Sequence, residues 1–107
     1  MNITLTEKHI KNKLVASIAF DGNLVLSECN RAKEQLQSTI QKYKAFQISL
    51  EKAESIDLSF VQLLISFFET IVHDKKEIKM LKILNPNIKN ILETTGFINQ
   101  IEKYTES

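Results

Sequence analysis

The stretch Ser55–Leu64, which reads SIDLSFVQLL, decides the fold of this chain. Asp57 stands directly before a dense apolar run, and a carboxylate at that place satisfies the free backbone N–H groups of a helix N-terminus. We therefore predict a helix over Leu58–His73 with Asp57 as its N-cap. Apolar side chains at helical spacing predict the face that packs on a sheet: Val61, Leu64, Ile65, Phe68, Ile71 and Val72.

Three further apolar side chains of this helix, Phe60, Leu63 and Phe67, lie between the sheet-facing side and the polar side. They make the apolar sector wider than the usual stripe of a surface helix. Two interpretations are open. The helix is simply well buried, or these three side chains dock a partner, because a large exposed apolar patch marks an interaction site.

The chain before this helix alternates between strand and helix patterns. Apolar alternation predicts a first strand around Ile3 and Leu5, a second over Leu14–Phe20 and a third over Ala45–Leu50. A helix over Glu28–Tyr43, capped by Ser27, is predicted between the second and third strands.

Polar segments separate these elements. Asp21-Gly22-Asn23 is a turn signal directly after the second strand. Glu51–Ser55 reads as a polar link before the Asp57 cap.

The chain after this helix continues the alternation. Asp74-Lys75-Lys76 forms a charged turn, and Ile78–Leu84 reads as a fourth strand. Asn85-Pro86 starts a short helix that ends before Gly96, where a glycine suits the residue after a helix. A last amphipathic helix is predicted over Phe97–Tyr104. The order β-β-α-β-α-β-α-α predicts an α/β fold with a mixed four-stranded sheet, its helices packed mainly on one face, in a single domain over residues 1–107.

Composition excludes several classes of function. The chain has 107 residues and a formal net charge of +1, which gives no global attraction to nucleic acid or membranes. The only cysteine, Cys29, cannot form an internal disulfide, so we expect a reducing, cytoplasmic location. No apolar run approaches the roughly 20 residues of a membrane span, so no membrane insertion is expected.

The sequence shows no arrangement of residues typical of catalysis. His9 and His73 have no nucleophile or carboxylate near them at a catalytic spacing, and two separated histidines do not suggest a metal site. The only glycines are Gly22 and Gly96, so there is no glycine-rich phosphate loop. We therefore expect no enzyme activity, no metal and no cofactor.

Four segments in register resemble the STAS domain family, the fold of the bacterial anti-sigma-factor antagonists. Ser55–Leu64 is similar to the family's conserved stretch of an apolar residue, Asp, Ser or Thr, and then Gln-Leu-Leu. Phe20–Leu24, Ile83–Pro86 and Leu92–Phe97 resemble the turn after the second strand, the entry to the third helix and the closing Leu-x-x-x-Gly-Phe of the family. The similarity extends from about Leu14 to Phe97.

The chain departs from the family at the positions of the phosphoswitch. The resemblance places Leu58 where the antagonists carry the Ser or Thr that a kinase phosphorylates, and Phe60 where they carry a Gly. The acidic residue common in the preceding strand is replaced by Ser49. Phosphorylation is thus not expected at the usual position. Ser59, one residue on, has a hydroxyl near a helix N-terminus that favours anions, although a small polar residue is also ordinary there.

The resemblance implies a regulatory protein–protein interaction module, and Asp57 is a candidate partner contact as well as a cap. The partner would be an anti-sigma or serine-kinase-type ATP-binding domain, and a homodimer is also compatible with the sequence. Two other STAS roles stay open, an adaptor in chemotaxis-type signalling and a subunit of a lipid ABC transporter. The expected partner-binding residues come from the Asp21–Asn23 turn and the start of the helix: Asp21, Gly22, Asn23, Asp57, Leu58, Ser59, Phe60, Gln62, Leu63 and Phe67.

Overall fold

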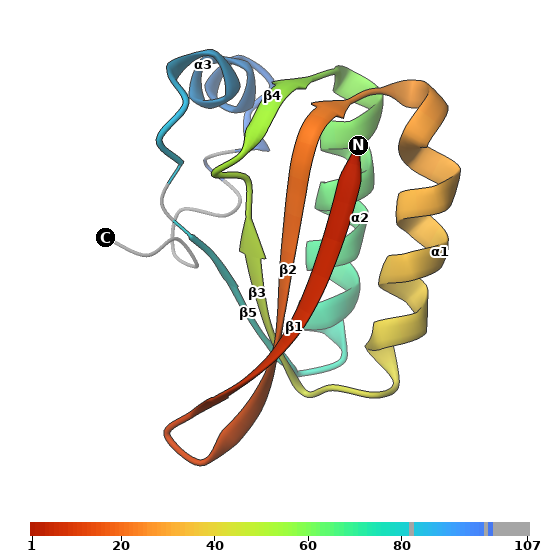
Figure 1. The fold of residues 1–107 in the computed structure, drawn as a ribbon, viewed down its shortest axis with the longest axis vertical. Helices are drawn as coiled ribbons and strands as arrows, with labels where there is room; N and C mark the ends of the chain where they lie inside the picture. Colours follow the sequence, from red (N-terminus) through yellow and green to blue (C-terminus); the bar gives the residue numbers. More distant parts are fainter. Residues whose placement is uncertain (82, 98, 100–107) are drawn as a thin grey trace.

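The computed structural model shows a mixed sheet with two helices packed side by side on one face (Figure 1). It describes residues 1–81, 83–97 and 99. In chain order the elements are β1 (Asn2–Ile10), β2 (Lys13–Leu24), the 3₁₀ helix η1 (Leu26–Glu28), α1 (Cys29–Ile40), β3 (Ala45–Ser49), β4 (Ala53–Ile56), α2 (Leu58–His73), β5 (Glu77–Met80) and α3 (Pro86–Thr94).

The sheet has the order β1-β2-β3-β5, and β4 pairs with the far end of β2. β1 and β2 are antiparallel, whereas β2 with β3, β2 with β4, and β3 with β5 are parallel. The mixed α/β fold is confirmed. The expectation of four strands is wrong, because Ala53–Ile56, within the segment read as a polar link, forms the fifth strand on β2.

Strand β2 also differs from the prediction, because it continues through Asp21-Gly22-Asn23 to Leu24. The segment is therefore not a turn between elements. It contains a register shift between Gly22 and Asn23, and Gly22 has a φ of +86°, which a residue without Cβ adopts readily. The turn-forming composition is used for a bulge in a strand and not for a chain reversal.

The helices begin and end near their predicted positions, with one wrong cap. Helix α2 and its Asp57 cap are confirmed. Helix α1 ends at Ile40, and Ser27 does not cap it, because Ser27 lies inside η1 and Glu28 occupies the N-cap without a side-chain hydrogen bond. Gly96 follows α3 with a φ of +81°, as expected for a glycine beyond a helix end. The last predicted helix falls largely outside the described residues.

The buried face of α2 is rotated relative to the prediction. Phe60 and Phe67 are buried, whereas Val72 is 41% exposed and Ile65 is half-buried. The reason is packing against two neighbours, because α2 contacts α1 as well as the sheet. The Phe60 ring meets Phe20 of β2 edge to face with centroids 5.5 Å apart, and Phe67 meets Phe46 of β3 in the same way.

Within the described residues, no helix has both the length and the apolar character that crossing a membrane requires.

Candidate functional site

Asp57 fixes the start of α2 with both of its carboxylate oxygens. Oδ1 accepts a hydrogen bond from the backbone N–H of Phe60 at 3.0 Å, which caps the helix. Oδ2 accepts from the backbone N–H of Leu26 at 2.8 Å, at the first residue of η1. The Asp57 amide in turn donates to the carbonyl of Leu24 at 3.0 Å. One side chain therefore joins the beginnings of two helical segments at the end of β2.

The same end of the sheet brings the Asp21–Asn23 segment beside the start of α2. Asn23 pairs with Ser55 across β2 and β4, and the Ser55 hydroxyl donates to Asn23 Oδ1 at 2.8 Å. Asn23 is exposed, while Asp21 and Gly22 are half-buried. The two segments that the sequence places in one site are thus adjacent in space.

Two large apolar side chains are exposed next to the Asp57 carboxylate. Leu58, the first residue of α2, is 56% exposed, and Leu26 is 66% exposed. Gln62, one turn after Leu58 on the helix, is exposed as well. We call this set the Asp57 surface; it consists of Asn23, Leu26, Asp57, Leu58 and Gln62.

Other expected contact residues have different surroundings. Phe60 is completely buried and Phe67 is 5% exposed, so the expectation that they dock a partner is wrong for the folded chain. Leu63 is half-buried in a groove between α1 and α2 of about 170 Å³. Ser59 is half-buried in the first turn of α2.

Sequence reasoning missed Leu26. The residue follows a predicted turn and belongs to no periodic pattern, so nothing in the sequence marks it as exposed. Its place in the site depends on the hydrogen bond to Asp57, which joins residues 31 positions apart.

Cys29 is the thiol nearest to the Asp57 carboxylate in the described part of the chain. Burial and then the nearby Asp57 carboxylate raise the pKa of the Cys29 thiol, so the thiol stays protonated at neutral pH. The thiol faces the carbonyl of Val25 at 3.8 Å. No group of three or more metal-ligating side chains occurs within the described part of the chain.

Comparison with known proteins identifies the fold. No family model and no curated protein sequence matches the chain. Among solved structures, an anti-sigma factor antagonist from Mycobacterium paratuberculosis superposes with a TM-score of 0.77 at 13% identity, over 94% of this chain and 83% of that one. The unphosphorylated anti-sigma factor antagonist SpoIIAA gives 0.72 at 11% identity, over 96% and 86%.

A third solved structure agrees with these two. A Shewanella loihica protein described as having a SpoIIAA-like fold gives a TM-score of 0.65 at 9% identity, over 97% of this chain and 83% of that one. The chain therefore has a mixed α/β fold shared with regulatory proteins. In particular, it has the STAS fold of the anti-sigma factor antagonists, as the sequence motifs predict.

Proposed function

We propose that this chain is a regulatory module that binds a partner protein through the Asp57 surface. The observation that supports this most directly is the pair Leu26 and Leu58, both more than half exposed beside a carboxylate held by two backbone amides. Exposed apolar side chains that are adjacent to one another on a surface mark a protein interaction site. Asn23 and Gln62 supply hydrogen-bonding groups at its edge.

We infer the kind of partner from the fold. An anti-sigma factor antagonist acts on an anti-sigma factor, and the resemblance predicts a serine-kinase-type ATP-binding domain. SpoIIAA is known in an unphosphorylated and a phosphorylated form. The resemblance predicts that Leu58, which has no hydroxyl to accept phosphate, stands at the position of the phosphorylated residue. The complex is therefore expected to be constitutive, or controlled on the partner, and insensitive to the partner's kinase activity.

The test is isothermal titration calorimetry with a purified ATP-binding anti-sigma domain from the same genome. We expect the double variant L26D/L58D to weaken binding at least about 100-fold, because removing two central apolar contacts of an interface costs several kcal/mol. The matched control is V72D/L84D. It also replaces two exposed apolar residues by aspartate, but both residues lie outside the Asp57 surface. Equal binding by wild type and L26D/L58D would exclude the Asp57 surface as the binding site for this partner.

The adaptor role in chemotaxis-type signalling, the transporter-subunit role and a homodimer stay predictions. No contact of the described residues favours one of them over an anti-sigma partner. Calorimetry with a chemotaxis kinase or a lipid ABC transporter component in place of the anti-sigma domain would separate these roles.

A further inference from the structure

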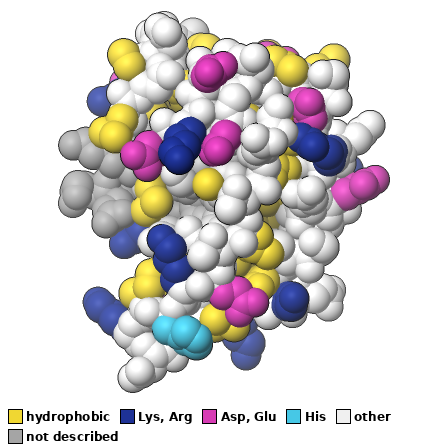
Figure 2. All heavy atoms as spheres, in the orientation of Figure 1, with side chains coloured by type: hydrophobic (Ala, Val, Ile, Leu, Met, Phe, Trp, Pro, Cys, Tyr) yellow, Lys and Arg dark blue, Asp and Glu magenta, His cyan; other side chains and the backbone are white. Residues whose placement is uncertain are grey.

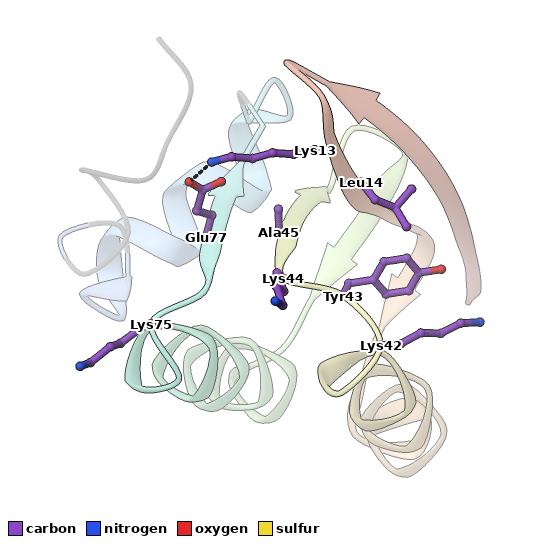
Figure 3. Close-up of a pocket in the computed structure, with 8 residues that line it drawn as sticks. All are labelled: Lys13, Leu14, Lys42, Tyr43, Lys44, Ala45, Lys75 and Glu77. Carbon is purple, nitrogen blue, oxygen red and sulfur yellow. Dashed lines mark hydrogen bonds and ion pairs between the residues drawn. The ribbon is translucent and has the colours of Figure 1, made fainter.

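A second concave site lies at the opposite end of the molecule from the Asp57 surface. It is a pocket of about 510 Å³ formed where the start of β2 beside the β1–β2 turn, the α1–β3 connection and the α2–β5 connection meet (Figure 3). Helix α2 separates the two sites, and its 16 residues span roughly 24 Å at 1.5 Å per residue. The pocket is lined by Lys13, Leu14, Lys42, Tyr43, Lys44, Ala45, Lys75 and Glu77.

The pocket carries an excess of positive charge. Its only acid, Glu77, is bound to Lys13, with Nζ and Oε1 2.6 Å apart. Among the described residues, the ammonium groups of Lys42, Lys44 and Lys75 form no ion pair with a carboxylate. These three lysines line one cavity in a chain whose net charge is only +1.

Helix ends do not account for all of these lysines. Cations are favourable near a helix C-terminus, and Lys76 fills that role for α1 by donating to the carbonyl of Ile40. Lys44 lies beyond the last turn of α1, and its carbonyl accepts from the amide of Glu77 at 3.0 Å as the chain enters the sheet. Lys42 sits with its ammonium 5.8 Å from the centroid of the Tyr43 ring.

The charges are distributed along the molecule and not mixed evenly. Figure 2 shows basic side chains around the lower end of the visible face and most acidic side chains in its upper half. Because exposed charges interact over only about 8–10 Å at physiological salt, an anionic ligand at the lower end experiences mainly the charges near it. These are the pocket lysines, Glu77, which is paired with Lys13, and Glu7, whose carboxylate accepts a hydrogen bond from the Tyr43 hydroxyl at 2.9 Å.

The shape of the pocket distinguishes an extended ligand from a small anion. Lys42 and Lys75 point to opposite sides of the pocket, away from each other (Figure 3). A single phosphate or carboxylate could not contact both, whereas a chain of carboxylates could. Between the lysines, the floor is apolar, with Leu14 39% exposed and Tyr43 and Ala45 buried beneath it.

We propose that this pocket, which we call the lysine pocket, binds an acidic peptide segment of a partner protein that carries an apolar side chain among its carboxylates. The apolar side chain contacts Leu14, and the flanking carboxylates pair with Lys42, Lys44 and Lys75. This site is independent of the Asp57 surface and does not rest on the proposed function.

The test is fluorescence anisotropy with the fluorescein-labelled peptide Glu-Glu-Phe-Glu-Glu at low and physiological salt. We expect saturable binding that weakens with salt. The variant K42E/K44E/K75E should weaken binding at least about tenfold, because three exposed charge pairs are lost together and replaced by repulsion. The peptides Gln-Gln-Phe-Gln-Gln and Glu-Glu-Ala-Glu-Glu should each bind more weakly than the probe.

The matched control is K33E/K52E/K89E, which changes the net charge equally at exposed lysines outside the pocket. It should bind the probe within about twofold of wild type, since remote exposed charges are screened. If K42E/K44E/K75E does not fold by circular dichroism, K42Q/K44Q/K75Q replaces it. Absence of saturable binding to wild type, equal weakening by both triple variants, or tighter binding to a single-stranded oligonucleotide or anionic vesicles than to the probe would overturn the proposal.

Discussion

The carboxylate of Asp57 accepts a hydrogen bond from the backbone amide of Leu26 at 2.8 Å while it caps α2. This contact joins the segment after β2 to the segment after β4, at the point where those two strands run parallel. It also fixes Leu26 against Asp57, the residue directly before Leu58.

Replacement of Asp57 by alanine removes the helix cap and the link to Leu26 together. We expect D57A to lower the free energy of unfolding by about 2 kcal/mol, from one cap and one further hydrogen bond. D57N should lose less, because its amide oxygen still accepts from Phe60. Urea denaturation measures both. A loss below about 0.5 kcal/mol for D57A would show that the cap contributes little.

Truncation of Phe60 should lower the stability of the fold much more than truncation of Leu58. F60A removes a fully buried ring that packs edge to face on Phe20, and it should lower stability by about 3–5 kcal/mol. L58A removes a side chain that is 56% exposed, so its effect on stability should stay within about 0.5 kcal/mol. Thermal denaturation of both variants measures the difference. Similar losses would mean that one of the two side chains is misplaced.

The substitution L58S introduces a hydroxyl at the position where the resemblance places the phosphorylated residue. Incubated with an ATP-binding serine-kinase partner and labelled ATP, wild type should incorporate no phosphate, whereas L58S should become labelled at position 58. The variant L58S/S59A confirms the position by mass spectrometry. Labelling of wild type at Ser59, with loss of partner binding, would contradict constitutive binding.

Gly22 and Gly96 both have a positive φ, and neither would meet a severe clash with an added Cβ. For Gly22 the nearest atom is the Cα of Met1 at 3.7 Å, and for Gly96 nothing lies within 4 Å. G22A and G96A should therefore each cost about 1–2 kcal/mol from backbone conformation alone. G96N should cost less, because asparagine tolerates this region. Urea unfolding of all three variants checks this, and a G22A loss far above that of G96A would indicate a packing role for Gly22.

Much of the fold could be predicted from local patterns. Helix α2 and its cap follow from one aspartate before an apolar run, and β3 follows from strict alternation. Strand β4 could not be predicted, because its four residues, Ala53–Ile56, are held by pairing with β2 and not by their own propensity. The Asp21–Asn23 segment was wrongly predicted as a turn for a similar reason. A glycine at a bulge and a glycine in a turn cannot be told apart from the local sequence.

The adjacency of the two segments of the candidate site was predicted from the sequence, because the turn and the Asp57 motif were assigned to one surface, and Asn23 does lie beside Ser55. The sequence could not rank Phe60 and Phe67 against Leu58 for exposure. All are apolar residues of one helix, and their exposure depends on how α2 rotates between the sheet and α1. Leu26 could be assigned to the site only from its hydrogen bond to Asp57, which the sequence does not reveal.

The most direct test of the central claim is a pair of ¹H–¹⁵N correlation spectra of the labelled chain, recorded with and without the unlabelled anti-sigma domain. The Asp57 surface predicts that the largest shift changes fall on the amides of Leu26, Leu58, Ser59 and Gln62. The amides of β1, at the edge of the sheet, should stay unchanged. Largest changes along β1 or around the lysine pocket, with the amides of Leu26 and Leu58 unmoved, would contradict the account.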